Sequence, residues 1–180
     1  MPDFCGLLEA EIPPLRRYAR ALLRDAARAD DLIQETLLRA LAKQHLWQPG
    51  TNLRAWLFTL MHNLHVNFVR QSVREGAMVD VEEVSGDLIA TTDPTASRQL
   101  RELEEAIARL PVEQRQVLLL IGLEGVRYDE AAVILGIPLG TVRSRLSRAR
   151  EALRELSGRD EDRSLPAAPP AQTAVSAEAA

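Results

Sequence analysis

Hydrophobic residues recur with helical spacing in two separate blocks of the chain. In the first block, apolar residues return every three or four positions within residues 7–74, which predicts three helices. The second of these is expected at about 27–44 and the third at about 53–74, with the turn sequence Gln-Pro-Gly-Thr-Asn between them. Pro13 and Pro14 are expected in the first turn of the first helix, or at a kink within it.

The same spacing returns in the second block and predicts four more helices. One carries the stripe from Leu100 to Leu110, and Pro111 opens the next. A short helix is expected at about 127–135, ending at Gly136, and a longer one runs from about 138 to 156. No alternation typical of paired strands accompanies these patterns. The chain is therefore predicted to be all-α.

The stretch between the blocks has lost the helical period and is strongly acidic. It holds six carboxylates and no basic residue over 75–93. We predict two small helical domains joined by a flexible acidic linker, with a disordered Ala- and Pro-rich tail at the C-terminus. The valines of the linker leave a short strand or helix there as an alternative. The expected boundaries are 1–75 for the three-helix domain, 76–96 for the linker, 97–157 for the four-helix domain and 158–180 for the tail.

Charge is distributed unevenly, and this changes the classes of function that remain. The net charge is −4, which by itself argues against nucleic-acid binding, yet residues 139–154 carry five arginines and one glutamate. A single cysteine, Cys5, excludes a disulfide scaffold. No apolar run is long enough to span a membrane, and the acidic N-terminal stretch is unlike a secretory signal. We therefore expect a cytoplasmic protein without membrane insertion.

Residues 127–150 have the pattern of a helix-turn-helix. Ala131 and Ala132 are small enough for two helices to cross closely, Gly136 suits the end of the first helix, and Pro138 suits the first turn of the second. Apolar positions anchor the second helix on the core. The alternative is a helical hairpin with a solvated basic face.

The other face of that second helix carries the groups that read duplex DNA. Arginine forks bind phosphate and guanine edges, and hydroxyl groups bind either. We predict that this face contacts DNA through a set of five residues: Thr141, Arg143, Ser144, Ser147 and Arg148.

Motifs in both blocks resemble a known family. Residues 30–36 and 52–58, together with Asn63, resemble region 2 of the extracytoplasmic-function (ECF) sigma factors. Residues 110–116, 128–132 and 140–150 resemble region 4 of the same family, and both regions occur in the family order. Residues 52–59 also resemble the EcfG-like subgroup that runs the general stress response of alphaproteobacteria.

The resemblance implies a sigma factor that binds core RNA polymerase and directs it to promoters, with region 4 reading the −35 element and region 2 opening the −10 element. A polar strip on the third helix has amides for base edges and guanidiniums for phosphates, preceded by a loop able to hold a flipped base. The implied −10 residues are Asn52, Asn63, Asn67, Arg70 and Arg74. A solvated helix face is the alternative explanation of this strip.

The second helix presents an acidic and apolar face that, by the same resemblance, docks on the polymerase β′ clamp helices. Its residues are Asp31, Gln34, Glu35 and Leu38. Carboxylates at the start of a helix, favoured by the helix dipole, are the simpler explanation of part of this face. The resemblance also implies contact of the second domain with the polymerase β flap, an anti-sigma partner, and stress-response genes as targets.

Other classes of function find less support. His62 and His65 lie three residues apart but lack a third ligand, so no metal site is expected, and neither a cofactor motif nor a catalytic constellation occurs. We expect no enzymatic activity. Two rivals stay open: a helix-turn-helix regulator that works without polymerase, and a sigma-like decoy that binds an anti-sigma factor. A decoy of that kind needs a receiver domain, for which this chain has no room.

Overall fold

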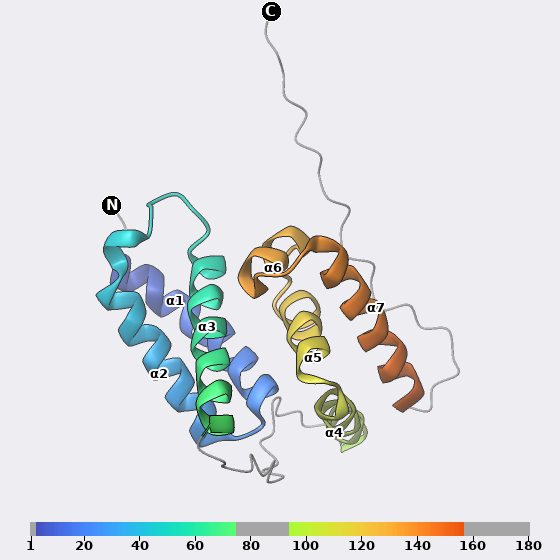
Figure 1. The fold of residues 1–180 in the computed structure, drawn as a ribbon. Helices are drawn as coiled ribbons and strands as arrows, with labels where there is room; N and C mark the ends of the chain where they lie inside the picture. The colour runs from blue at the N-terminus through green and yellow to red at the C-terminus, as the bar shows by residue number, and fades with distance from the viewer. Residues whose placement is uncertain (1–2, 75–93, 157–180) are drawn as a thin grey trace, which may run out of the picture.

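The structure is a computed structural model that describes residues 3–74 and 94–156 (Figure 1). Every regular element within these residues is helical. Most of the predicted linker and the whole of the predicted tail lie outside the described residues. The helix α4 begins at Pro94, so its first residues belong to the stretch expected as linker. Residues 3–74 are called the first half below, and residues 94–156 the second half.

The first half consists of three long helices and one short 3₁₀ turn. Asp25 begins the second long helix because its side chain accepts a hydrogen bond from the Arg28 backbone N–H at 3.0 Å. Asn52 does the same for the third helix, through the Ala55 N–H at 3.1 Å. The elements are α1 (Phe4–Leu23), α2 (Ala26–Ala42), η1 (Gln44–Leu46) and α3 (Leu53–Arg74).

Of the two positions predicted for the prolines, the structure has the interior of α1 and not its first turn. The helix starts at Phe4, so Pro13 and Pro14 lie in its interior. Aromatic packing explains the longer helix, because the Phe4 ring lies 5.6 Å from Trp47 and 6.5 Å from Trp56, measured between centroids. Contacts of this kind stabilise the N-terminal turns against the loss of two backbone donors to proline.

The core of the first half is built around two aromatic rings. Tyr18 of α1 and Phe58 of α3 meet edge to face, with centroids 5.2 Å apart and planes at 76°. Both side chains are almost fully buried, and burial raises the pKa of the Tyr18 phenol. Aliphatic side chains from all three helices surround the pair: Leu15, Leu32, Leu57 and Met61. This packing fixes α2 and α3 against α1.

The second half contains the predicted helix-turn-helix. Its elements are α4 (Pro94–Arg109), α5 (Val112–Leu118), the π-helical turn η2 (Leu119–Leu123), α6 (Tyr128–Leu135) and α7 (Leu139–Leu156). Gly136 ends α6 with a φ of 63°, as expected for a residue that stops a helix in the left-handed region. The π turn was not predicted, because a single extra residue leaves the hydrophobic spacing nearly unchanged.

The two halves pack against each other. Helix α3 lies along α6, and α1 contacts η2 and α5 (Figure 1). Buried side chains of both halves form one continuous cluster. Separate helical patterns had given no indication of this contact, since each half has its own apolar stripe.

Arg115 of α5 connects the ends of two helices across the boundary. Its guanidinium donates to the Leu22 carbonyl near the end of α1 at 3.0 Å, and to the carbonyls of Ala108 and Leu110 at the end of α4. The last carbonyls of a helix have no partner within the helix, so one side chain here satisfies acceptors in both halves. Burial and the nearby Arg24 lower the pKa of the Arg115 guanidinium.

We predict that Arg115→Met lowers the free energy of unfolding by about 2 kcal/mol, because charged hydrogen bonds to buried carbonyls are lost. Urea denaturation followed by circular dichroism measures this. The matched control is Arg16→Met, which removes an exposed arginine of α1 and is expected to change stability by less than about 0.5 kcal/mol. Equal unfolding midpoints for the two variants would contradict the role given to Arg115.

Candidate nucleic-acid interface

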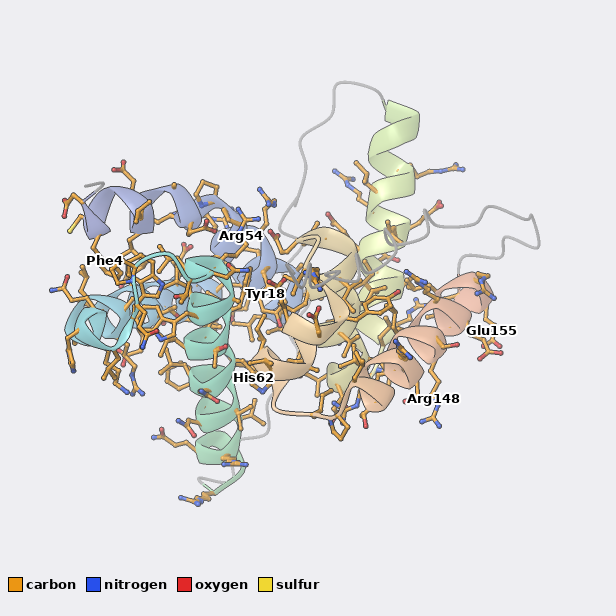
Figure 2. All side chains as sticks on the ribbon, turned by 90° about the horizontal axis from the view of Figure 1, so that it is seen from above. Phe4, Tyr18, Arg54, His62, Arg148 and Glu155 are labelled. Carbon is orange, nitrogen blue, oxygen red and sulfur yellow. The ribbon has the colours of Figure 1, made fainter. Side chains whose placement is uncertain are left out.

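The predicted reading face of α7 is free in the structure. Val142 and Leu146 are buried, so they fix the rotation of α7 about its axis. The positions between them point outward, and Arg143, Ser147 and Arg148 are exposed. Figure 2 shows Arg148 pointing away from the body of the protein. An arginine-bearing helix of this kind suits insertion into a major groove.

The two remaining residues of this face lie at the start of α7. Ser144 is exposed and its hydroxyl donates to the Thr141 carbonyl at 3.1 Å, while Thr141 itself is half-buried. Both lie in the part of a recognition helix that enters the groove first. The five predicted residues therefore share one surface, of which Thr141 is the least accessible.

The polar strip of α3 forms a second exposed surface. Asn63, Asn67, Arg70 and Arg74 are all exposed along the C-terminal half of that helix. Their spacing places them on a single side, as predicted. Asn52 does not belong to this strip. It lies eleven residues before Asn63, about 16 Å away along the helix axis at 1.5 Å per residue.

The predicted polymerase-docking face of α2 is exposed as well. Asp31 and Gln34 are open to solvent, and the exposed fraction of Leu38 is 62%. Glu35 is partly buried and pairs with Arg39 at 2.9 Å, as an i, i+4 pair on one helix. An apolar side chain this exposed, bordered by carboxylates, is typical of a protein-binding surface.

Sequence reasoning missed two apolar members of this region. The apolar spacing of the second predicted helix continues to Leu41, yet 40% of Leu41 is exposed, because α2 ends at Ala42 beyond the edge of the core. Leu46 in η1 is 60% exposed. A periodic pattern continues to the end of a helix, whereas the core beneath it stops earlier.

The histidine pair of α3 lies toward the second half. Figure 2 shows His62 on the side of α3 that faces α6. His65 is buried, and burial, His62 and Arg115 together lower its pKa to about 4. Burial also lowers the pKa of His62. Within the described residues no three groups of the metal-binding kind come together, and both imidazoles are explained by the boundary between the halves.

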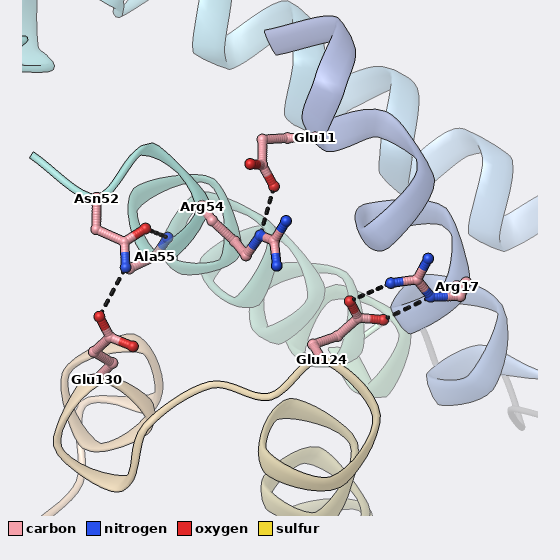
Figure 3. Close-up of polar contacts among 7 residues, drawn as sticks. All are labelled: Glu11, Arg17, Asn52, Arg54, Ala55, Glu124 and Glu130. Carbon is pink, nitrogen blue, oxygen red and sulfur yellow. Dashed lines mark hydrogen bonds and ion pairs between the residues drawn. The ribbon is translucent and has the colours of Figure 1, made fainter. Parts of the chain in front are cut away.

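Three charged or polar side-chain pairs surround an open cavity of about 270 Å³ at that boundary (Figure 3). Arg17 of α1 bonds both oxygens of Glu124, at 2.9 and 3.3 Å. The amide of Asn52 donates to Glu130 of α6 at 2.7 Å. Within the first half, Arg54 and Glu11 form a third pair at 2.7 Å.

None of these pairs was predicted from the sequence, because the partners are far apart in the chain. Asn52 alone had been named, as a residue of the −10 set. Residues 17 and 124 are 107 positions apart, and residues 52 and 130 are 78 positions apart. Glu124 is the most informative of the group, since its side chain is 0% exposed while that of Arg17 is 49% exposed. Burial raises the pKa of Glu124, and the bonds from Arg17 oppose that change.

An exposed, arginine-bearing helix within a helix-turn-helix is typical of helical DNA-binding proteins. Two family models match the same parts of the chain: the sigma2 domain of PhyR over residues 8–62, and sigma-70 region 4 over residues 100–153. None of the described helices is both long and apolar enough to cross a lipid bilayer.

Relatives with similar sequences narrow the class. The ECF RNA polymerase sigma factor EcfG of Rhodopseudomonas palustris is 44% identical over 82% of this chain and 81% of its own length. The sigma factor RpoE of Bartonella quintana, solved in complex with the anti-sigma factor NepR, has a TM-score of 0.76 at 36% identity, covering 89% of this chain and 100% of that one. CnrH, solved with the cytosolic domain of CnrY, has a TM-score of 0.62 at 25% identity, covering 88% and 89%.

The chain belongs to the ECF RNA polymerase sigma factors. This agrees with the resemblance found in the sequence, including that to the EcfG-like subgroup.

The depressed pKa of His65 predicts that stability falls as the pH is lowered. A histidine with a folded pKa of about 4 and an ordinary value of 6.5 takes up protons mainly in the unfolded state between these values. Its contribution is therefore complete above about pH 6.5, and about 3 kcal/mol of stability is lost on the way down to pH 4.

Urea denaturation of the wild type and His65→Gln across pH 4.5–7.5 measures this effect. The difference between the two unfolding free energies is expected to shrink toward acidic pH, because glutamine does not titrate there. His45→Gln, at an exposed position of η1, serves as the control and should follow the wild type. A difference for His65→Gln that is constant with pH would contradict the burial of a neutral imidazole.

Proposed function

We propose that this chain binds core RNA polymerase through α2 and directs it to promoters that α7 and α3 recognise. The observation that carries this proposal is the exposure of two separate DNA-reading surfaces, one in each half, beside an acidic and apolar docking face. A regulator that reads only duplex DNA uses the first surface and leaves the other two without a role. Membership of the ECF sigma factors agrees with all three.

For the −35 element we propose direct reading of the duplex by α7. Arg143 and Arg148 reach base edges or phosphates in the major groove, and Ser144 and Ser147 add shorter contacts. Thr141 lies at the start of the helix, where backbone amides favour a phosphate. The helix also carries arginines outside this face, which raise the positive potential along the groove.

For the −10 element we propose binding of the separated strand along α3. Asn63 and Asn67 both donate and accept hydrogen bonds, so they suit base edges that pairing no longer occupies. Arg70 and Arg74 neutralise phosphates. Opening a promoter requires no bond chemistry. It requires that these contacts exceed the few kcal/mol that unstacking and unpairing cost for each base. We therefore infer a non-enzymatic role.

For polymerase docking we propose burial of Leu38 against the β′ clamp helices, with Asp31, Gln34 and Glu35 contacting basic or polar groups around it. The exposed Leu41 and Leu46 extend the same apolar surface. The proposed site of action is the bacterial cytoplasm. Contact of the second half with the β flap belongs to the same proposal.

Regulation by an anti-sigma factor is also proposed. Support comes from the complexes of two relatives, since RpoE was solved with NepR and CnrH with CnrY. The similarity to EcfG supports stress-response genes as the targets.

A second candidate function is sequestration of an anti-sigma factor without transcription. The match of residues 8–62 to the sigma2 domain of PhyR favours it, because PhyR was solved as an anti-anti-sigma factor bound to NepR. The exposed arginines of α7 argue against it, since sequestration has no need of a DNA-reading face. Binding to core polymerase separates the two functions.

Purified chain is expected to bind core RNA polymerase in a pull-down and to support run-off transcription from a genomic promoter library. Leu38→Asp should weaken core binding at least tenfold, because a buried leucine contributes about 1.5–3 kcal/mol. Leu156→Asp, which alters an exposed leucine at the end of α7, should bind core as the wild type does. Binding to duplex DNA without any binding to core would contradict the sigma function.

The double variant Arg143→Ala, Arg148→Ala is expected to lower run-off transcription from a cognate promoter about tenfold or more, since each arginine–base contact contributes about 1–3 kcal/mol. Core binding should stay unchanged. Arg98→Ala, an exposed arginine of α4 outside the reading face, is the control. Loss of core binding in the double variant would show that this face docks on polymerase instead of DNA.

A further inference from the structure

Two carboxylates of the second half accept hydrogen bonds from two side chains of the first half. Glu124 accepts two hydrogen bonds from Arg17, and Glu130 accepts one from Asn52 (Figure 3). The chemistry of each pair resembles that of nucleic-acid binding, in which arginine holds an anion and asparagine bonds an acceptor. The second half therefore presents negative groups where DNA would present phosphate and base acceptors.

Glu124 is held in place by the π turn that precedes it. Its backbone N–H bonds the Leu119 carbonyl at 3.1 Å, five residues back, and Val126 bonds the Leu120 carbonyl at 2.9 Å. The chain then turns at Gly125, whose φ is 66°. Single π turns within α-helices occur frequently at functional sites. Here the extra residue directs a carboxylate into the boundary, where its side chain is fully buried.

Local hydrogen bonds at the starts of α3 and α6 orient Asn52 and Glu130 toward each other. The oxygen of Asn52 accepts the Ala55 N–H, which leaves its amide group pointing outward. One oxygen of Glu130 accepts the Arg127 N–H at 3.3 Å, which leaves the other for Asn52. Glu130 thus binds the amide of Asn52, the residue for which the resemblance to the ECF sigma factors implies contact with the −10 element.

The packed arrangement is too small to reach both promoter elements. The −35 and −10 elements lie about 25 base pairs apart, or about 85 Å at 3.4 Å per base pair. A compact body of about 135 residues has a radius of gyration near 14 Å and is roughly 40 Å across. The nineteen residues between Arg74 and Pro94 can span at most about 65 Å when extended. Binding to both elements therefore requires the halves to separate.

We propose that Glu124 and Glu130 are autoinhibitory residues, which hold Arg17 and Asn52 in the free chain and cover a surface that binds the −10 strand once the halves separate. Arg17 supplies a phosphate contact on the uncovered surface, and Asn52 supplies a base contact. The proposal rests on the sigma function and adds to it a promoter-binding residue, Arg17, and its intramolecular competitor.

The first test measures the distance between the halves in the free chain. Cys5 is exposed on α1, and Glu151→Cys adds a second label site on the exposed side of α7. Pulsed electron spin resonance on this background should give one narrow distance distribution. Adding Glu124→Gln and Glu130→Ala should broaden it and move it to longer distances, and Arg17→Gln should do the same from the other side of the pair.

The matched control is Asp129→Ala. It removes another carboxylate from the first turn of α6, one that bonds Arg127 within the second half. Its distribution should stay narrow. A broad distribution in the unaltered background would overturn the proposal, as would an unchanged one after both glutamates are altered.

The second test measures binding of a single-stranded oligonucleotide carrying the −10 sequence of a promoter that the chain transcribes with core polymerase. Glu124→Gln with Glu130→Ala should bind about tenfold more tightly, because the competent state becomes more populated. Arg17→Gln should open the chain without this gain, since it removes a phosphate contact. An equal gain in affinity for Arg17→Gln would overturn the phosphate-binding role of Arg17. An equal gain for Asp129→Ala would show that the effect is not specific to Glu124 and Glu130.

The two measurements separate this proposal from the sigma function. Absence of run-off transcription with every variant would overturn the sigma function, whereas the distance between labels is measured without polymerase or DNA and tests the closed arrangement alone.

Discussion

Arg115 is the group on which the relative position of the two halves depends most directly. Its guanidinium bonds carbonyls at the ends of α1 and α4, which are remote in the chain. Helix ends leave several acceptors without partners, and a buried acceptor without a partner costs about 1–3 kcal/mol. One side chain therefore makes the end of α1 and the end of α4 dependent on each other. Burial, His62 and the positive charge of Arg115 together lower the pKa of His65.

Basic and acidic side chains occupy different parts of the molecule, and the net charge does not show this separation. The exposed faces of α7 and the C-terminal half of α3 carry guanidinium and amide groups, whereas the boundary carries Glu124 and Glu130 from the second half. A chain with a net charge of −4 can thus keep two exposed faces that carry basic side chains. The buried carboxylate of Glu124 is bound by Arg17, because a buried charge is tolerated only when it is paired.

The local parts of this fold could be predicted from the sequence. Helical spacing indicated α3 over the residues that form it, and Gly136 and the Arg-rich stripe of α7 indicated the helix-turn-helix. These signals lie within a few turns of chain. Two positions in the helix were left open for Pro13 and Pro14, and aromatic contacts between distant residues extend α1 so that both lie in its interior.

The candidate site also contains residues that could be predicted from the sequence and residues that could not. Exposure of Arg143, Arg148 and the α3 strip follows from the rotation of single helices, which apolar anchors determine. The pairing of Arg17 with Glu124 depends on how two halves meet, and neither residue stands out within its own helix. Asn52 shows both cases, since its capping role is local and its bond to Glu130 is not.

The π turn η2 makes this boundary sensitive to the number of residues as much as to their identity. An α-helix advances about 100° per residue, so removing one residue from the turn would rotate the helix after it by that angle and carry Glu124 away from Arg17. Most substitutions at the exposed Leu123 would leave the angle unaltered. Relatives of this chain are therefore expected to tolerate substitutions in this turn more readily than changes of its length. A one-residue gap here in an alignment is expected to mark chains whose two halves pack in a different orientation.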